Sequence, residues 1–246
     1  MKALGVALSA LVLVSGCAAH ATTSSSEPLA PSGSGTSGST HASNSPSSPA
    51  PPFDKTRHSL TDPNSIWVIV NKTHPITPLD FRPRIALVRG YQVAVPAAGP
   101  LTRLMDDADR AGVPLKIASA FRSYGYQEGV HSHLVATEGL QAADAISARP
   151  GYSEHQTGLA VDLQPADGTC ALSACFSGTA AGRWLVTHAW RYGFVVRYTQ
   201  ANRRLTGYSP EPWHFRYVGV PLARELRTTH AGSLEAFFGV GGGDYR

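Results

Sequence analysis

Cysteine is scarce in this chain of 246 residues, which holds only Cys17, Cys170 and Cys175. A metal site on the last two alone would lack two of the four ligands that a structural zinc ion needs. Positive charge is also thin: the formal net charge is +4, and the basic residues, almost all arginine, are scattered. They do not interleave with aromatic residues as in nucleic-acid-binding proteins, so we expect no nucleic-acid partner. The apolar stretch at residues 3–14 is too short to span a bilayer.

The N-terminal residues have the pattern of a secretory signal, in which a short positive region precedes an apolar core at residues 3–14. The next residues, Val-Ser-Gly-Cys at 14–17, resemble the lipobox of bacterial lipoproteins, in which the cysteine carries the lipid. We therefore predict that residues 1–17 are a lipoprotein signal peptide and that Cys17 is lipidated. The protein would then be exported and anchored to the bacterial cell membrane, facing the cell wall. An ordinary signal peptide cut after Ala19 is the alternative.

The rest of the chain divides by composition into a linker and one domain. Residues 18–52 are mostly Ser, Gly, Thr, Ala and Pro, and cannot bury enough surface to offset their ordering entropy, so we predict a disordered tether. Residues 53–246 are enough for one well-buried domain, which we expect to be monomeric. In an exported protein, the close pair Cys170 and Cys175 predicts a disulfide, with metal binding as the alternative.

Within the domain, short helical and strand patterns follow one another in irregular order. Apolar residues at 101, 104, 105 and 108 have helical spacing and precede a stop at Gly112. From residue 158 to 163, apolar residues alternate with Ala160 and Asp162, as in a strand. This order predicts an α+β fold, a small mixed antiparallel sheet with flanking helices. The predicted helices are 101–111, 126–138 and 182–192, and the predicted strands are 65–71, 115–120, 158–163, 194–198 and 214–218.

Two clusters of polar residues stand out against these patterns. His155 and Asp162 flank the alternating segment, and about fifty residues further on lie Glu211 and His214. Two imidazoles, one carboxylate and a spare glutamate are the inventory of a catalytic zinc site, which keeps one position open for water and needs a nearby base. Pro212 argues against a helix at the second cluster, so we expect a bend that enters a strand there. The hypothesis rests on the combination, because each residue alone is unremarkable.

Five segments form an ordered series of motifs. They are Trp-Val-Ile-Val-Asn-Lys at 67–72, Ser-Ala-Phe-Arg-Ser-Tyr at 119–124 with Gln127, Ser-Glu-His-Gln-Thr-Gly-Leu-Ala-Val-Asp-Leu at 153–163, Tyr-Gly-Phe-Val-Val-Arg-Tyr at 192–198, and Glu-Pro-Trp-His-Phe-Arg-Tyr-Val-Gly at 211–219. In this order they resemble the zinc D-alanyl-D-alanine carboxypeptidases of the VanY type. These belong to the superfamily of lysostaphin-like peptidases and the hedgehog signalling domain. The loop at 170–175 and the tail after Leu226 fall outside the resemblance.

The resemblance implies the metal ligands, the cofactor and the reaction. His155, Asp162 and His214 would hold one zinc ion per chain, on the central sheet. Glu211 would be the general base, and Arg122 would steady the substrate carbonyl or its oxyanion. The implied reaction is that of a D,D-carboxypeptidase, which removes the C-terminal D-alanine from peptidoglycan stem peptides. These stem peptides are therefore the expected partner.

The resemblance also implies a set of substrate contacts, each with a structural alternative. For the polar residues of the set, the alternative is a hydrogen bond in a turn or a helix cap. For the aromatic residues, the alternative is core packing. The set is Ser119, Gln127, Ser153, Tyr198 and Trp213.

The motifs leave open which bond is cut. An L,D-carboxypeptidase acting on tetrapeptide stems, or an endopeptidase that cuts within the stem or cross-bridge, would use the same zinc, base and oxyanion donor. A non-catalytic, envelope-binding lipoprotein would keep the fold without turnover. Loss of Glu211 or of a ligand would indicate that last alternative, and all four residues are present.

Overall fold

The computed structural model describes residues 52–245. The predicted signal peptide, the lipidation site Cys17 and nearly all of the predicted tether lie outside the described residues. Among the residues described, no helix is long and apolar enough to cross a membrane.

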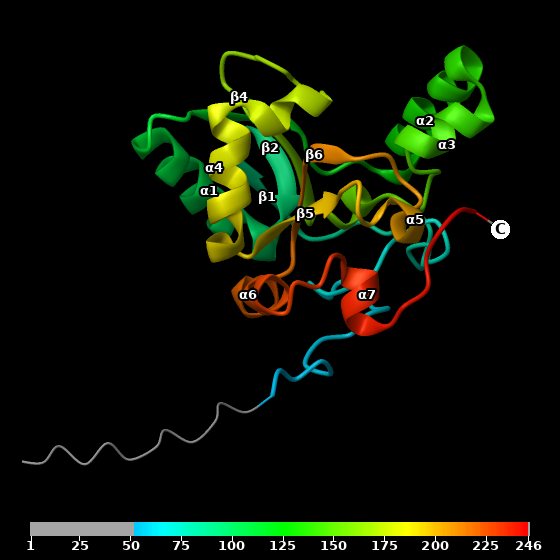
Figure 1. Ribbon diagram of the computed structural model, residues 1–246. Coiled ribbons are helices and arrows are strands. Elements are labelled where there is room, and N and C mark those ends of the chain that lie inside the picture. The colour runs from blue at the N-terminus through cyan, green and yellow to red at the C-terminus, as the bar shows by residue number, and fades with distance from the viewer. Residues whose placement is uncertain (1–51, 246) are drawn as a thin grey trace, which may run out of the picture. The chain divides into compact units, whose positions relative to one another are not determined.

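A four-stranded antiparallel sheet forms the centre of the domain (Figure 1). Its strands, in spatial order, are β3 (Leu115–Ser119), β4 (Ala160–Pro165), β6 (Glu211–Tyr217) and β5 (Phe194–Tyr198). A separate hairpin pairs β1 (Ile85–Val88) with β2 (Tyr91–Ala94). The predicted α+β class is confirmed, and every strand pairing in the part of the chain described is antiparallel.

The helices surround this sheet. Figure 1 shows α2 and α3 as a hairpin at the opposite end of the domain from α1 and α4, with α6 and α7 below the sheet. The α-helices are α1 (Val95–Arg110), α2 (Tyr124–Glu138), α3 (Leu140–Ile146), α4 (Ala180–His188), α5 (Arg203–Thr206), α6 (Val220–Thr228) and α7 (Leu234–Phe238). Single 3₁₀ turns are η1 (Glu154–Thr157), η2 (Ala174–Gly178) and η3 (Ala189–Tyr192).

Local signals explain most helix limits. The Ser123 hydroxyl accepts a hydrogen bond from the amide of Tyr126 and so caps the start of α2. Helix α1 begins six residues before the predicted segment, since Pro96 suits a first helical turn. The predicted helix 182–192 tightens into 3₁₀ geometry before Gly193, whose φ of +83° closes it. A Cβ at Gly193 would lie 2.9 Å from the Cα of Gly219, so this turn admits only glycine.

The predicted strand at residues 65–71 is wrong. Residues 65–67 form a turn, and residues 67–71 are buried, but the segment joins neither sheet; its one ladder contact is an isolated bridge between Asn71 and His74. Its alternating side chains pack into two different apolar clusters, with Val68 and Val70 in the larger one. The Arg216 guanidinium donates a hydrogen bond to the carbonyl of Val68 at 2.8 Å. In a sheet, the backbone amide of a neighbouring strand would donate to this carbonyl instead. The run of β-branched residues therefore indicated that these side chains are buried, not that the segment pairs with another strand.

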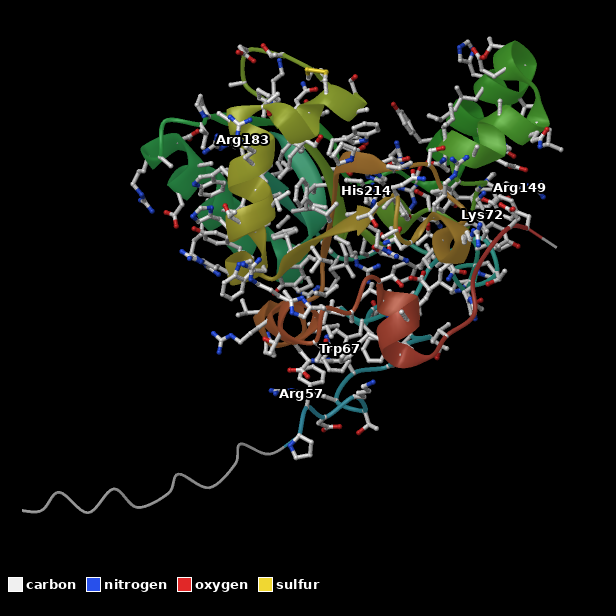
Figure 2. All side chains as sticks on the ribbon, in the orientation of Figure 1. Arg57, Trp67, Lys72, Arg149, Arg183 and His214 are labelled. Atoms are coloured by element: carbon white, nitrogen blue, oxygen red, sulfur yellow. A yellow bond between two sulfur atoms is a disulfide. The ribbon has the colours of Figure 1, made fainter. Side chains whose placement is uncertain are left out.

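Two apolar clusters hold the domain together. The larger one packs α1 and α4 against the sheet, with buried residues that include Leu101, Leu104 and Phe215. The smaller one joins α6 and α7 to Trp67, which lies beside α7 (Figure 2). The polar clusters of the sequence lie on β4 and β6 of this sheet and on η1 before β4.

Candidate active site

Strand pairing brings together two of the three predicted ligands. In the register of β4 and β6, Asp162 lies directly opposite His214, so both side chains occupy the same face. His155 reaches the same point from η1, a turn that the Ser153 hydroxyl caps by accepting from the His155 amide. The three side chains are buried, and one ligand atom from each lies within 4.8 Å of the others. Figure 2 shows His214 between the sheet and the α2–α3 hairpin.

Hydrogen bonds orient the two imidazoles. The carbonyl of Ala120 lies 2.7 Å from Nδ1 of His155; a carbonyl only accepts, so we assign the proton to Nδ1. Nε2 of His155 then faces Asp162 at 3.2 Å. His214 is reversed: its Nδ1 lies 3.2 Å from Asp162, and its Nε2 lies 3.3 Å from Glu154. Each ring therefore has one nitrogen held by the protein and the other free for a metal, as in known metal sites.

The electrostatics of this group suit a cation. Burial lowers the pKa of His155 to about 4, which keeps its imidazole neutral. Burial alone would raise the pKa of Asp162, but His155 and His214 outweigh it and hold that pKa well below its usual range. Burial also opposes protonation of His214, yet the neighbouring carboxylates of Asp162 and Glu154 raise its pKa to about 9, so a metal ion bound at Nδ1 would displace a proton from this ring. Oδ1 of Asp162 is buried without a hydrogen-bond partner, an arrangement that a bound metal ion would satisfy.

Glu211 and Arg122 lie in the same cavity, of about 200 Å³, as the three ligands. Glu211 is the first residue of β6, and its carboxylate lies 3.8 Å from Nδ1 of His214. Burial raises the pKa of Glu211 to about 7. The Arg122 amide donates to the carbonyl of His155 at 3.2 Å, and its Nε is buried without a partner. The predicted bend at Pro212 is instead part of the strand, next to a bulge between Val196 and Tyr198.

The predicted substrate contacts separate into two groups. Ser153, Tyr198 and Trp213 line the cavity, and the ring of Tyr198 packs against His214 with centroids 4.8 Å apart. Ser119 and Gln127 are not among its lining residues. Gln127 is fully buried and donates to the Ser147 hydroxyl and the Ala148 carbonyl, both on the cavity wall, so it supports that wall rather than lining it.

The predicted disulfide is confirmed. Cys170 and Cys175 are bonded and close a loop of six residues between β4 and α4. Leu172, at the tip of this loop, lines the cavity together with Val130 and Leu134 of α2. The loop outside the resemblance therefore contributes an apolar side to the cavity.

Four buried charged residues behind the ligands were not predicted as site residues. They occur within the motifs or in the tail, and all but Glu154 carry charge between apolar or aromatic neighbours in the sequence, which was the available signal. Their partners lie far apart in the sequence, so the pairing itself could not be predicted. The four are Glu154, Arg197, Arg216 and Glu235.

Comparison with known proteins gives concordant matches. Residues 91–220 match the family described as VanY: D-alanyl-D-alanine carboxypeptidase. YodJ of Bacillus subtilis is 31% identical over 191 residues, which cover 73% of this chain and 69% of YodJ. The L,D-carboxypeptidase DacB of Streptococcus pneumoniae is 40% identical, with a TM-score of 0.60 over 72% of this chain and 89% of DacB. A vancomycin-resistance D,D-pentapeptidase VanY, solved in complex with Zn(II), is 32% identical, with a TM-score of 0.60 over 69% of this chain and 97% of that protein.

Proposed function

Because this chain belongs to the VanY family of D-alanyl-D-alanine carboxypeptidases, we propose that it removes the C-terminal D-alanine from peptidoglycan stem peptides. The observation that carries the proposal is the buried group of His155, Asp162 and His214, which shares one cavity with Glu211 and Arg122. The enzyme class and cofactor predicted from the sequence, a zinc metallopeptidase, are confirmed by the family and by this His-Asp-His group.

The donor set fits zinc. Two imidazoles and one carboxylate are typical ligands of catalytic zinc sites, which leave a further position open. The neutral state of His155 and the ionised state of Asp162 are those that metal binding requires. Zinc bound there supplies a Lewis acid that activates water and polarises the scissile carbonyl.

Two residues beside the metal position are suited to transfer the proton of water and to stabilise the negative charge that develops on the carbonyl oxygen. Glu211, whose pKa burial raises to about 7, is suited to take a proton from water near neutral pH and return it to the leaving amine. The unpartnered Nε–H of Arg122 is a donor for the oxyanion that forms on the carbonyl oxygen. Because Nε of Arg122 is buried and the Glu211 side chain is only 15% exposed, their interactions with substrate are stronger than they would be in water.

A second candidate is L,D-carboxypeptidase activity on tetrapeptide stems. The observation in its favour is the 40% identity to the L,D-carboxypeptidase DacB, above the 32% identity to the D,D-pentapeptidase VanY. The two reactions differ in the length of the stem peptide and in the stereochemistry of its penultimate residue. A cavity of about 200 Å³ suits a small terminal residue such as alanine in either case.

Mass spectrometry of defined muropeptides, incubated with and without a chelator, tests the proposal. We expect the pentapeptide to lose one alanine and the chelator to abolish the loss. Loss from the tetrapeptide alone would replace the D,D assignment with the L,D one, and cleavage of cross-linked dimers would indicate an endopeptidase. If every substrate stays intact while zinc is bound, the non-catalytic, envelope-binding alternative takes precedence.

We further propose that the protein acts on the outer face of the bacterial cell membrane, tethered through a lipid on Cys17. Support comes from the lipobox-like residues 14–17 and the following Ser/Gly/Pro-rich stretch. Metabolic labelling with a fatty acid should mark the wild-type chain but not the Cys17→Ala variant. Equal labelling of both would refute the anchor.

A further inference from the structure

Behind the metal-ligand group lies a buried ionic network that the carboxypeptidase activity leaves unexplained. Its charged members are Glu154, Arg197, Arg216 and Glu235, and each is at most 1% exposed. Two carboxylates and two guanidiniums balance in charge. Even a balanced set is costly to bury, and apolar residues of similar volume are often no less stabilising. Stability alone is therefore a weak explanation for the network, and its position beside the ligands points to a role in the site.

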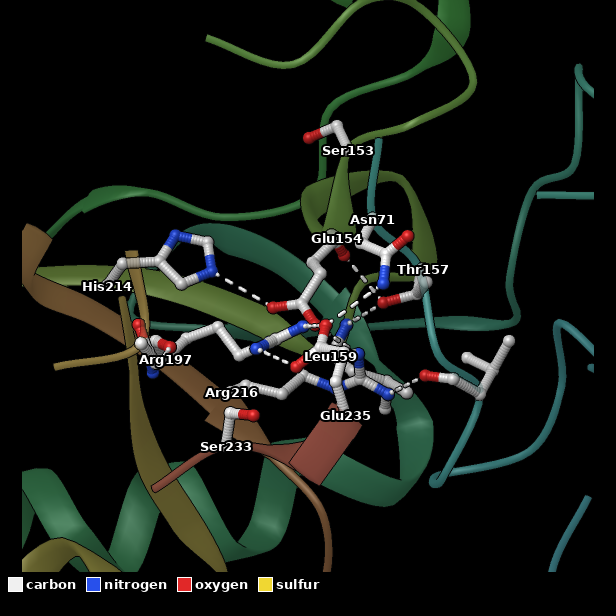
Figure 3. A network of polar contacts seen from close by, with 12 residues as sticks. Asn71, Ser153, Glu154, Thr157, Leu159, Arg197, His214, Arg216, Ser233 and Glu235 are labelled. Carbon is white, nitrogen blue, oxygen red and sulfur yellow. Dashed lines mark hydrogen bonds and ion pairs between the residues drawn. The ribbon is translucent and has the colours of Figure 1, made fainter. Parts of the chain in front are cut away.

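Glu154 connects the network to a metal ligand. Its Oε1 accepts hydrogen bonds from Nε of Arg197 at 2.8 Å and from Nη1 of Arg216 at 2.9 Å, which fix the carboxylate. Its Oε2 faces Nε2 of His214 at 3.3 Å (Figure 3). An ionised carboxylate only accepts, so in the neutral ring that a metal requires, the proton stays on Nε2 and the lone pair is on Nδ1, the atom that faces Asp162. A carboxylate in this position sets the orientation and basicity of a ligating imidazole.

Glu235 completes the network from a different part of the chain. Its Oε2 accepts from Nη1 of Arg197 at 2.9 Å, and its Oε1 accepts from Nη2 of the same guanidinium, so the pair is bidentate (Figure 3). Asn71 donates to Oε1 of Glu235 at 3.1 Å. Helix α7 is anchored by Leu234 and Phe237, which pack in the smaller apolar cluster. Glu235 is therefore held in place by packing that is independent of the ligands.

We propose that Glu235 is a positioning residue for the metal site: it holds Arg197, Arg197 holds Glu154, and Glu154 holds the imidazole of His214. The inference rests on the proposed function, because it takes His214 to be a zinc ligand. Helix α7 lies beyond the family match at residues 91–220, and none of its residues lines the cavity, so the C-terminal segment would support the site without touching metal or substrate.

The test compares Glu235→Gln with Phe237→Leu in the full chain. Glutamine keeps the size of the side chain but removes the charge that holds Arg197, and this lets the guanidinium and Glu154 shift away from His214. Phe237→Leu loosens the same helix, since this ring packs against Phe53 and Phe238, but it leaves the network intact. Zinc dissociation constants come from competition with a chromophoric chelator, and the absorption spectrum of the Co(II)-loaded protein reports ligand geometry.

We expect Glu235→Gln to raise the zinc dissociation constant about tenfold and to change the Co(II) spectrum, because partners behind metal ligands tune affinity by this order. Phe237→Leu should lower the melting temperature while both metal readouts stay as in wild type. Glu235→Asp retains the charge on a shorter side chain and should recover most of the zinc affinity. If Glu235→Gln does not fold, Glu235→Asp becomes the test variant, and its zinc dissociation constant should rise less than tenfold but measurably above that of the wild type.

The outcomes separate the inference from the function on which it rests. If the wild-type chain binds zinc and both Glu235 variants match it in affinity and spectrum, Glu235 has no positioning role and the proposed function stands. If Phe237→Leu weakens zinc as much as Glu235→Gln at equal stability loss, the effect belongs to helix packing and the inference is refuted. If the wild-type chain binds no zinc, the proposed function fails first.

Discussion

Glu211 is the residue on which turnover should depend most directly. Replacing it with glutamine preserves its size but removes its ability to accept a proton, so we expect kcat to fall by about 10²- to 10⁴-fold. The zinc content should stay at one ion per chain, because the three predicted ligands are His155, Asp162 and His214. D-alanine release and elemental analysis measure the two effects. Glu138→Gln, the same change at an exposed site on α2, is the matched control.

Near-normal turnover in Glu211→Gln would remove this residue as the base, and loss of zinc would instead make it a ligand. The control matters because any loss of a negative charge alters attraction between the protein and a charged substrate. Glu138→Gln makes the same charge change at a residue that does not line the cavity, so it should leave kcat and zinc content unchanged.

At the residue scale, the catalytic and metal-binding residues could be predicted from the sequence, whereas the residues that position them could not. The histidines, Asp162 and Glu211 were recognisable by type and by motif. Glu154 lies inside a recognised motif, but its role depends on Arg197, Arg216 and His214, which are 43 to 62 residues away in the chain. A single sequence carries no information on such pairings, which arise only when β4, β5 and β6 assemble.

At the element scale, Asp144 joins the α2–α3 hairpin to the wall of the cavity. Its carboxylate accepts from Arg149 at 2.7 Å and contacts Nε2 of His131 at 2.9 Å. Burial opposes ionisation of Asp144, but Arg149 and His131 outweigh it and lower the pKa of this carboxyl below its usual value. Residues 146–148, which begin two positions after Asp144, line the cavity. Loss of this carboxylate should therefore affect both stability and substrate binding.

We expect Asp144→Asn to lower the free energy of unfolding by about 1 kcal/mol at pH 6, because a charge-assisted hydrogen bond is lost at a partly exposed site. A lowered folded pKa gives stability that is present above the unfolded pKa, near 3.8, and is lost as the pH falls through the lower folded value. The gap between variant and wild type should therefore shrink below about pH 4. Urea unfolding at pH 6 and pH 3 measures it. A gap that is equal at both pH values would show that Asp144 contributes through its shape rather than its charge.

Element positions followed from local patterns where local forces decide them. Gly139 and Gly193 end helical segments at the predicted points, and the alternation at 158–163 placed Asp162 on the face that meets His214. The strand predicted at 65–71 was wrong because this segment packs against a guanidinium and two apolar clusters instead of pairing with a strand. Sheet membership is a tertiary property, and periodicity reports only which side chains are buried.

At the scale of the whole molecule, the ligands join segments that would otherwise be held only by packing. His155 comes from a turn before β4, Asp162 from β4 and His214 from β6. A preformed site of this kind binds zinc in the folded state far better than in the unfolded state. The native state is therefore stabilised by mass action, by about 4 kcal/mol when free zinc is a thousand times its dissociation constant.

Zinc removal should accordingly lower the melting temperature of the wild-type chain by roughly 8–16 °C, at 2–4 °C per kcal/mol for a domain of this size. Asp162→Asn should melt at the same temperature with and without chelator, since the variant lacks one of three ligands and retains only weak metal binding. Differential scanning calorimetry, with zinc added back to the chelated wild type, measures both shifts. A chelator effect of equal size in Asp162→Asn would place the stabilising metal elsewhere in the chain, whereas recovery of the wild-type value on adding zinc back ties the stability of the whole domain to this one site.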